Sequence, residues 1–427
     1  MSNRRSVVKS AAVVVAAGVL VLTGCGRSAP SEVASVDDNL AEGTVEFWYA
    51  GGTPDAIESI ATAFEKENPQ VNIEITNVPE KSLDAKMIAA ITSGKVPDLA
   101  HLTTYTERSM IETGGFAAVP DELVDPSAYF DTAWQGGTKD GVAYAVPWTV
   151  ATAVLQYRKD LAEAAGVEAP TTWDELTSFT AALQQAGAEY GYALNVGYNQ
   201  YAAADFQNFA EQNGGHLLNS DGSAWTINDP KNVEALEFTW GNMVKNDVAS
   251  ADGPLFLDTV PWFTEGKVGA IVMGPWFEDW LVEAKGEEWT RTHLATAVVP
   301  AGDAGSVTGF TGDVLGVPKD ASNPDAAWKF VRYLSDPEVQ VRYYQESGIL
   351  PSVRSAWDAP EIADNPLMPP FKTAMETAVN TPQVSTWVEV GPIIGQALEK
   401  VARGQMSAQQ ALDEAQQRAE AIGVGSN

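Results

Sequence analysis

Between residues 44 and 102, strand-like and helix-like segments alternate along the chain. Residues 44–49 alternate like a strand, and Thr53-Pro54 marks a helix start because Pro favours the first helical position. The pattern predicts a strand at 44–49, a helix at 54–68, a strand at 71–78, a helix at 82–93 and a strand at 98–102. This order is typical of an α/β protein built on a parallel, doubly wound sheet.

Aromatic and hydroxyl side chains stand at the ends of these predicted strands. Trp48 and Tyr49 end the first strand, and Thr103, Thr104 and Tyr105 follow the third. Ligands of such sheets bind beyond the carboxyl ends of the strands. We therefore expect these residues to lie near any binding site.

A second folding unit is indicated further along the chain. Residues 143–157 (AYAVPWTVATAVLQY) are uncharged and β-rich, and Pro147 lies inside the run. Pro suits a chain that passes between two lobes better than one uninterrupted strand. Thr172 and Glu175 have capping-box spacing, and Asp221-Gly222 lies between apolar flanks as in a hairpin. The length allows two or three domains.

The beginning of the chain has the layout of a secretory signal peptide. Arg4, Arg5 and Lys9 precede an uncharged, mostly apolar run over residues 11–23, which is too short to span a bilayer. The residues up to Cys25, the only cysteine, read Leu-Thr-Gly-Cys and resemble a bacterial lipobox. That resemblance implies cleavage after residue 24 and lipid on Cys25, whereas the alternative is a lone buried thiol. Residues 25–43 are then a flexible spacer, and export uses the Sec or the twin-arginine route.

The charge of the chain restricts its partners. The formal net charge is −31 at pH 7, and loss of the basic leader would make the rest more acidic still. Such a body is a poor partner for nucleic acid. No cysteine remains for a disulfide after Cys25, so the exported part must depend on its hydrophobic core.

Motifs that would identify an enzyme are absent. Three histidines lie far apart, without the spacing of a metal site, and HExxH, GxSxG and the phosphate-cradling GxxxxGK[ST] do not occur. No metal or cofactor is predicted. A pair of catalytic carboxylates, as in a glycosidase, stays open because 57 acidic residues always place some pair close together.

Tryptophan is the distinctive residue type, with 13 copies. Trp173, Trp240 and Trp328 lie in amphipathic helical patterns and are predicted to be core. Trp48, Trp148 and Trp276 instead follow or precede turn-like residues. An indole at such a place can offer a flat apolar face to a ligand, and flat faces suit sugar rings.

Residues 264–276, TEGKVGAIVMGPW, resemble a motif of the extracellular solute-binding proteins of ABC importers, specifically the large family that serves carbohydrates. Further matches follow in family order over almost the whole exported chain. They are the strand and helix at 45–69, Val96-Pro97-Asp98-Leu99, Val146-Pro147-Trp148 with 155–160, Asn213-Gly214-Gly215, Val317-Pro318-Lys319, 327–334 with Asp336-Pro337-Glu338, and 350–354 (LPSVR).

The resemblance implies a two-lobe periplasmic-binding-protein fold (type II, Venus-flytrap) whose hinge the chain crosses more than once. It assigns residues 44–149 plus 304–349 to lobe 1 and 150–303 plus 350–427 to lobe 2. It implies a monomeric receptor, anchored by lipid such as palmitate to the outer face of the cell membrane. This receptor would capture a neutral mono- or oligosaccharide and deliver it to an ABC permease with a cytoplasmic ATPase.

Several ligand contacts are carried over by position. Trp276 and Trp387 resemble the family's stacking aromatics, Trp148 a ring at the hinge, and Thr104 and Tyr105 a loop that supplies polar and aromatic contacts. Gly312 and Asp313 lie on a crossover where close backbone approach and a hydroxyl acceptor are useful, while Arg354 and Glu389 have charged groups for ligand hydroxyls. Arg354 has a lobe–lobe salt bridge as its alternative, and Glu389 a solvated carboxylate.

One departure and three rival functions remain. Ala151 falls where some maltose-type relatives have an acidic contact, so a maltodextrin ligand does not follow. The first rival is a receptor for a cationic or peptide solute, suggested by the acidity, whose binding would weaken with salt. The second is a surface glycoside hydrolase, which would release product, and the third is an adhesion or scaffold protein.

Overall fold

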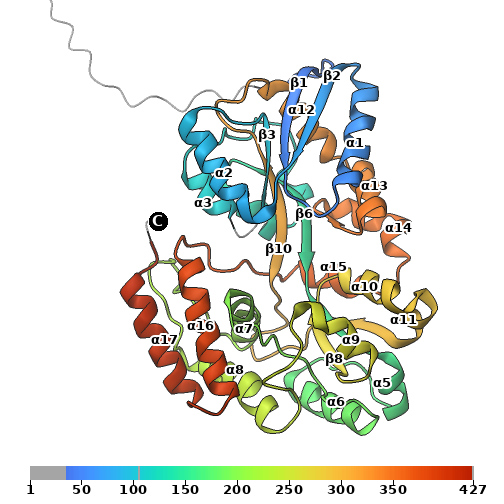
Figure 1. The fold of residues 1–427 in the computed structure, drawn as a ribbon, viewed down its shortest axis with the longest axis vertical. Helices are drawn as coiled ribbons and strands as arrows, with labels where there is room; N and C mark the ends of the chain where they lie inside the picture. The colour runs from blue at the N-terminus through green and yellow to red at the C-terminus, as the bar shows by residue number, and fades with distance from the viewer. Residues whose placement is uncertain (1–34, 104–105, 426–427) are drawn as a thin grey trace, which may run out of the picture.

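The computed structural model describes residues 35–103 and 106–425, and these form two lobes around separate sheets (Figure 1). The predicted two-lobe α/β architecture is confirmed. Cys25, Thr104 and Tyr105 lie outside the described residues. No helix in the described part of the chain is long and apolar enough to cross a membrane.

Lobe 1 is built on a six-stranded sheet in the order β11-β6-β10-β3-β1-β2. The strands β1, β2 and β3 are parallel, as the alternating pattern predicts, whereas β10 runs antiparallel to both β3 and β6 because it enters from the other lobe. The bounds of the strands are β1 (Glu42–Tyr49), β2 (Gln70–Asn77), β3 (Leu99–Thr103), β6 (Val146–Thr152), β10 (Phe310–Gly316) and β11 (Leu350–Pro351).

Helices cover both faces of this sheet, and a separate two-stranded hairpin belongs to the same lobe. The amphipathic helix α12 packs Phe330 against Phe47 of β1 and Phe64 of α1, which forms the centre of the lobe 1 core. The helices of lobe 1 are α1 (Pro54–Glu67), α2 (Glu80–Ser93), α3 (Glu107–Glu112), η1 (Pro126–Ala128), α4 (Asp131–Gly136), α12 (Pro324–Leu334) and α13 (Pro337–Ser347), and the hairpin is β4 (Thr138–Lys139) with β5 (Val142–Ala143).

The fold starts before the predicted spacer ends, which corrects the boundary at residue 43. Glu42 and Gly43 already pair with β2, and Ala41 is fully buried. Asp37 Oδ1 forms an ion pair with Nζ of the buried Lys329 of α12 at 2.6 Å. The end of the segment is thus bound to lobe 1, because its acidic residues have basic partners that only the tertiary structure supplies.

Lobe 2 contains a three-stranded antiparallel sheet in the order β8-β7-β9, surrounded by helices. Its core contains Phe206, Trp240 and Leu398, and Trp240 is fully buried as predicted. The elements are β7 (Val154–Arg158), β8 (Ala270–Met273), β9 (Leu294–Ala297), α5 (Lys159–Ala165), α6 (Trp173–Gln185), α7 (Gln200–Gln212), α8 (Pro230–Leu236), the π-helical η2 (Glu237–Met243), η3 (Phe256–Asp258), α9 (Thr259–Thr264), α10 (Trp276–Lys285), α11 (Glu287–His293), α16 (Trp387–Ala402) and α17 (Ala408–Ile422).

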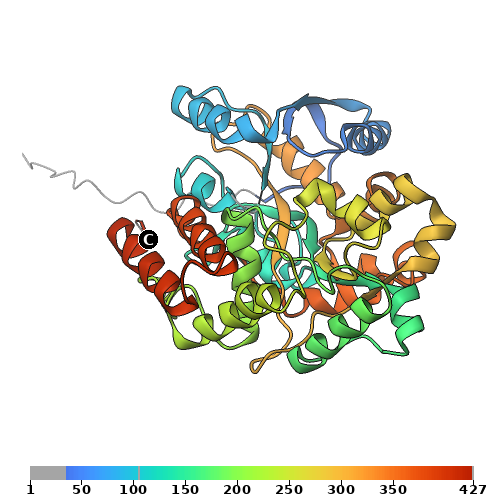
Figure 2. The same cartoon turned by 60° about the horizontal axis from the view of Figure 1, so that its bottom comes forward.

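Local signals in lobe 2 explain where several helices begin. Thr172 caps α6 by accepting from the backbone N–H of Glu175, as predicted, although the Glu175 carboxylate bonds Thr171 rather than Thr172. Asp229 caps α8 before Pro230. Figure 2 shows the red helices α16 and α17 on one side of β10 and the yellow α9 and α10 on the other.

The chain passes between the lobes three times, at residues 152–154, 298–310 and 352–386. The three passages lie side by side. The Thr152 hydroxyl donates to the carbonyl of Gly309, and the Thr308 hydroxyl donates to the carbonyl of Ala153. The backbone N–H of Phe310 donates to the carbonyl of Val379, which joins the second passage to the third. The third passage contains η4 (Arg354–Asp358), α14 (Pro360–Ala363) and α15 (Pro369–Met375), whose side chains form a small core between the lobes.

These passages lie a few residues from the predicted lobe boundaries. The strand β6 continues to Thr152, and β11 pairs with it through Leu350 and Pro351, so both remain in lobe 1 beyond residues 149 and 349. Strand β10 begins at Phe310 rather than near residue 304. Hydrogen bonds to a neighbouring strand set these limits, and a single segment of sequence does not reveal them.

Candidate functional site

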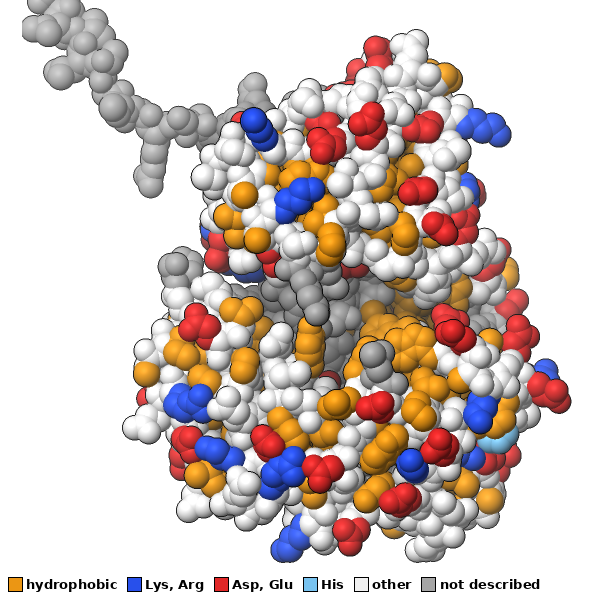
Figure 3. All heavy atoms as spheres, in the orientation of Figure 1, with side chains coloured by type: hydrophobic (Ala, Val, Ile, Leu, Met, Phe, Trp, Pro, Cys, Tyr) orange, Lys and Arg blue, Asp and Glu red, His pale blue; other side chains and the backbone are white. Residues whose placement is uncertain are grey.

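A hollow separates the two lobes on the face seen in Figure 3. It lies below the carboxyl ends of β1 and β3, where the strand order predicted a site. Hydrophobic side chains gather on its lower wall, over the part of lobe 2 where Figure 1 places α10. We call this hollow the interlobe cleft.

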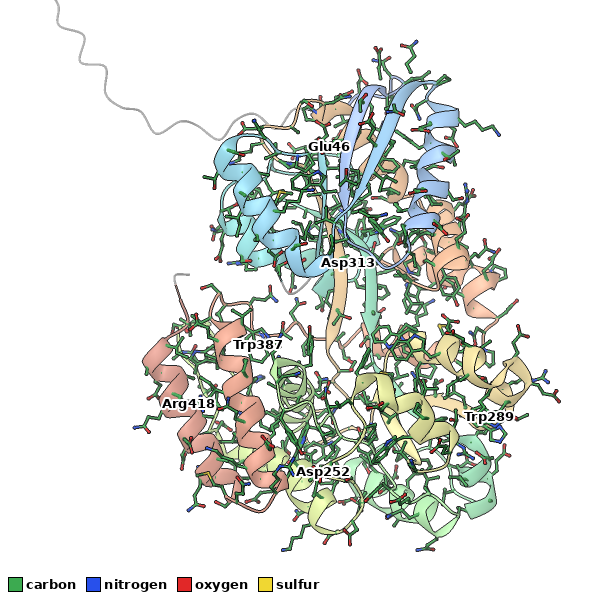
Figure 4. The ribbon with its side chains drawn as sticks, in the orientation of Figure 1. Glu46, Asp252, Trp289, Asp313, Trp387 and Arg418 are labelled. Carbon is green, nitrogen blue, oxygen red and sulfur yellow. The ribbon has the colours of Figure 1, made fainter. Side chains whose placement is uncertain are left out.

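On the lobe 1 side, Asp313 lies at the edge nearest lobe 2 (Figure 4). It stands in β10 between Thr103 of β3 and Thr149 of β6, where the register against β6 shifts. Thr149 Oγ1 donates to Asp313 Oδ2 at 2.9 Å, and His101 Nε2 lies 3.2 Å from the same oxygen. Asp313 remains 28% exposed, so its carboxylate is both held by protein and open to solvent.

Glu107 lies behind Asp313 and is almost completely buried at the start of α3. Its Oε1 has no hydrogen-bond partner among the described residues. Gly136 leaves the space for this carboxyl, because a Cβ there would stand 2.3 Å from Oε1. Burial and the negative charge of Asp313 raise the pKa of Glu107 well above its usual range, so the buried carboxyl is held in its neutral form.

The strand-end aromatics of lobe 1 are covered by protein, which corrects the prediction that they offer open ring faces. Trp48 donates to Glu46, and Lys86 Nζ lies 3.6 Å over its ring. Tyr49 is buried, and its hydroxyl joins those of Thr53 and Tyr343 at about 3 Å. Trp148 packs on Tyr343 with ring centroids 4.6 Å apart. The lobe 1 core encloses these rings, so they do not offer an open face to a ligand.

On the lobe 2 side, three aromatic rings form what we call the aromatic cluster: Phe256, Trp276 and Trp280. Phe256 lies 6.4 Å from Trp276 and 5.2 Å from Trp280 between ring centroids. Phe256 is 54% exposed and its neighbour Leu255 is 55% exposed, which is unusual for large apolar side chains. Trp276 was predicted from the sequence, whereas Phe256 and Trp280 were not, although Leu255-Phe256 after Gly253-Pro254 is a sequence signal of an exposed apolar turn.

Trp387 and Glu389 begin α16 at the end that faces lobe 1 (Figure 4). Trp387 is only 5% exposed and lies nearly parallel to Trp225 at 6.4 Å, so the lobe 2 core covers much of its ring. Glu389 is exposed, and so are Val388 beside it and Tyr201 at the start of α7. The predicted second stacking ring is therefore less open than Trp276.

Arg354 is held by other charged residues in lobe 1 and in the third passage. Its guanidinium contacts both carboxylate oxygens of Glu376 at 2.6 and 2.7 Å and Asp131 at 3.2 Å, and Nε donates to the carbonyl of Tyr129. The salt-bridge alternative describes this arrangement better than a free ligand contact. At Gly312, a Cβ would stand 2.5 Å from the carbonyl of Thr149, so the close approach there is to β6.

No group of three or more His, Cys, Asp or Glu side chains that could hold a metal occurs among the described residues. The polar group described at the cleft is the partly exposed carboxylate of Asp313, and the lower wall has hydrophobic side chains. Such groups bind a hydroxylated ligand through hydrogen bonds and ring stacking.

Asp205 provides a test of the lobe 2 electrostatics. It accepts from Asn195 Nδ2 at 2.8 Å, and burial raises the pKa of its carboxyl to about 6. Because the pKa of Asp205 is higher in the folded protein than in the unfolded chain, its protonated carboxyl contributes fully to stability below about pH 4. This contribution is lost as the pH rises through 6. Asp205→Asn keeps an acceptor for Asn195 and removes the charge. We expect it to add about 2 kcal/mol to the free energy of unfolding at pH 8 and little at pH 4.

Urea unfolding at the two pH values measures this effect, with the exposed Asp364→Asn as the matched control. An equal gain at pH 4 and pH 8 would contradict the assignment, because the other titrating groups are the same in both proteins and only the variant lacks the Asp205 carboxyl.

Comparisons with known proteins found a matching family model and similar chains. Residues 50–341 match the family model described as bacterial extracellular solute-binding protein. The sn-glycerol-3-phosphate-binding periplasmic protein UgpB of Escherichia coli (strain K12) is 24% identical over 414 residues, covering 88% of this chain and 91% of that protein.

Two solved structures have the same fold. The sugar-binding protein MalE of Xanthomonas citri has a TM-score of 0.81 at 27% identity, covering 89% of this chain and 97% of that one. The GacH receptor of Streptomyces glaucescens, solved unliganded and with acarbose, has a TM-score of 0.75 at 28% identity, covering 88% and 97%.

Proposed function

Because the chain belongs to the bacterial extracellular solute-binding protein family, the non-enzymatic substrate-binding components of ABC importers, we propose that it captures a neutral mono- or oligosaccharide in the interlobe cleft. Delivery to a permease driven by a cytoplasmic ATPase would follow from closure of the two lobes. The solved relatives that bind a sugar or acarbose support this ligand class.

The proposal is carried by two features: the partly exposed carboxylate of Asp313 in lobe 1, and the aromatic cluster in lobe 2, which includes the start of α10 on the lower wall of the cleft. Asp313 has a carboxylate that accepts hydrogen bonds from ligand hydroxyls, and Trp276 with Phe256 has the apolar faces on which a sugar ring stacks. A sugar needs both, since its hydroxyls require polar partners while its axial C–H groups form an apolar patch.

An anionic ligand fits the cleft less well, although one relative is named for sn-glycerol 3-phosphate. The carboxylate of Asp313 would repel a phosphate, and the guanidinium of Arg354 already pairs with Glu376 and Asp131. A cationic solute would be attracted by Asp313, so the salt dependence of binding separates that rival from a sugar.

The proposed mechanism is a population shift between open and closed lobes. A ligand that contacts Asp313 in lobe 1 and Trp276 in lobe 2 makes both contacts only when the lobes approach. The three passages between the lobes, joined through Thr152, Thr308 and Val379, are the natural hinge. The differential affinity of the ligand for the closed form then sets the closed population.

Attachment to the membrane through lipid on Cys25 is proposed from the sequence alone. The lipid would keep the receptor beside its permease on the outer face of the cell membrane. Two or three acyl chains suffice for stable anchoring at about 0.8 kcal/mol per buried methylene. Cys25→Ala should move the protein from the membrane fraction to the soluble fraction and abolish palmitate labelling, and a variant that stays in the membrane would contradict the proposal.

Thermal unfolding with a panel of solutes tests the ligand class. The panel contains glucose, galactose, maltose, cellobiose, trehalose, raffinose, sn-glycerol 3-phosphate, spermidine and a short cationic peptide. A ligand at about a thousand times its Kd adds about 4 kcal/mol to the free energy of unfolding and raises the Tm visibly. A shift with sugars alone supports the proposal, whereas a shift only with the phosphate or only with cations would replace it.

A further inference from the structure

Four elements of lobe 1 bring polar side chains together beneath the wall of the interlobe cleft. His101 comes from β3, Glu107 from α3, Thr149 from β6 and Asp313 from β10. Asp313 is the partly exposed member, whereas His101 is only 2% exposed and lies behind it. The family resemblance did not single out His101, and its side chain makes no contact with solvent that would suggest a binding role.

One hydrogen bond determines which nitrogen of the neutral His101 ring carries the proton. The backbone N–H of Ala50 donates to Nδ1 at 3.2 Å, so Nδ1 must be an acceptor. In the neutral ring the hydrogen then sits on Nε2, which lies 3.2 Å from Asp313 Oδ2. The approach in this structure is close but oblique rather than a well-aligned hydrogen bond.

The His101 ring has no freedom to turn away. Tyr49 stacks on it with ring centroids 5.2 Å apart and an interplanar angle of 17°. Tyr49 is itself held by hydroxyl contacts to Thr53 and Tyr343. A buried ring between a fixed backbone donor and a fixed aromatic neighbour presents Nε2–H in one direction only.

Both protein contacts to the Asp313 carboxylate fall on the same oxygen. Thr149 Oγ1 and His101 Nε2 approach Oδ2, and within the described part of the chain Oδ1 has no such contact. Because the carboxylate is rigid and planar, contacts that hold Oδ2 also fix the direction of Oδ1. Oδ1 is then left as an acceptor with a defined direction.

We propose that His101 is a positioning residue that, together with Thr149, orients Asp313 so that Oδ1 accepts a hydroxyl of the sugar in the cleft. This inference rests on the proposed function and deepens it. His101 thereby contributes to selectivity for a sugar that has a donor hydroxyl at this position over a deoxy analogue that lacks it, because preorganised acceptors discriminate most strongly against a missing donor.

Two substitutions separate the two nitrogens of the ring. In His101→Gln, the longer amide can place an N–H where Nε2 was and still donate to Asp313. In His101→Asn, the shorter amide can accept from Ala50 in place of Nδ1 but cannot reach Asp313. The probe is the panel sugar that raises the Tm most. We expect calorimetric Kd to rise about tenfold for His101→Asn and less than threefold for His101→Gln.

A double-mutant cycle with Asp313→Asn shows whether His101 acts through Asp313. If it does, His101→Asn should weaken binding about tenfold in the original protein and hardly at all when Asp313→Asn is already present. Equal losses in the two backgrounds, or equal losses for the Asn and Gln variants, would overturn the inference while leaving the proposed function intact. Failure of every panel sugar to bind the original protein would overturn both.

A measurement that needs no ligand tests the geometry itself. The chain has only three histidines, so His216→Asn and His293→Asn assign the ring signals in a long-range ¹⁵N spectrum of the full-length protein. We expect a proton on Nε2 of His101 and none on Nδ1. A spectrum with the proton on Nδ1 would overturn the inference, because Nε2 could then donate nothing to Asp313.

Discussion

Trp276→Ala should weaken binding of the panel sugar by about 30- to 100-fold, which corresponds to about 2–3 kcal/mol. Trp276 begins α10 directly after Gly274-Pro275 and belongs to the aromatic cluster with the exposed Phe256. Its indole Nε1 has no hydrogen-bond partner among the described residues. Loss of the ring removes the stacking face, and isothermal titration calorimetry measures the change in Kd.

The matched control is Trp289→Ala. Trp289 packs against the same hydrophobic cluster of lobe 2 but lies at its outer edge, stacked on His293 at 4.2 Å (Figure 4). Both variants lose a half-buried indole, so both should lower the Tm by a similar amount. Trp276→Phe should keep most of the affinity. If Trp276→Ala binds as tightly as the control, Trp276 does not contact the sugar.

Glu107→Gln should make the protein more stable at neutral and alkaline pH. The raised pKa of Glu107, caused by burial and by the charge of Asp313, means that the folded protein holds a proton that the unfolded chain releases. The stabilising contribution is fully present below the unfolded pKa of about 4.3 and is lost as pH rises through the folded pKa. Between those limits the free energy of unfolding falls by about 1.4 kcal/mol for each pH unit, and this loss does not occur with Gln at position 107.

Urea unfolding from pH 5 to pH 9 measures this slope. Near pH 5 the Gln variant should match the original protein or be slightly weaker, because its amide also lacks a partner. The advantage should then grow with pH, whereas the exposed Glu58→Gln on α1 should leave the slope unchanged. The same slope with and without the Glu107 carboxyl would show that Glu107 ionises freely in the folded protein. Sugar affinity at pH 7 should stay within twofold for Glu107→Gln, because a neutral side chain replaces a neutral one.

Local sequence patterns predicted much of the fold of lobe 1. Strands β1, β2 and β3 and helices α1 and α2 lie within a few residues of the predicted ranges. Periodicity and capping signals act over one or two turns, so they determine where an element forms. A passage between the lobes was also predicted near Pro147, but Pro147 lies inside β6 and the chain crosses five residues later, between the end of β6 at Thr152 and the start of β7 at Val154.

The sequence by itself determined the class of protein, because strand–helix alternation and family motifs are local or follow chain order. The partners of individual side chains were decided only by the tertiary structure. Tyr49 and Trp148 are closed over by Tyr343 of α13, and Arg354 is bound by Glu376 and Asp131. His101, Glu107 and Asp313 also come together only in the tertiary structure, because β10 lies some 200 residues along the chain from β3 and α3. Local periodicity indicates which side chains turn inward, but it does not indicate which of them meet.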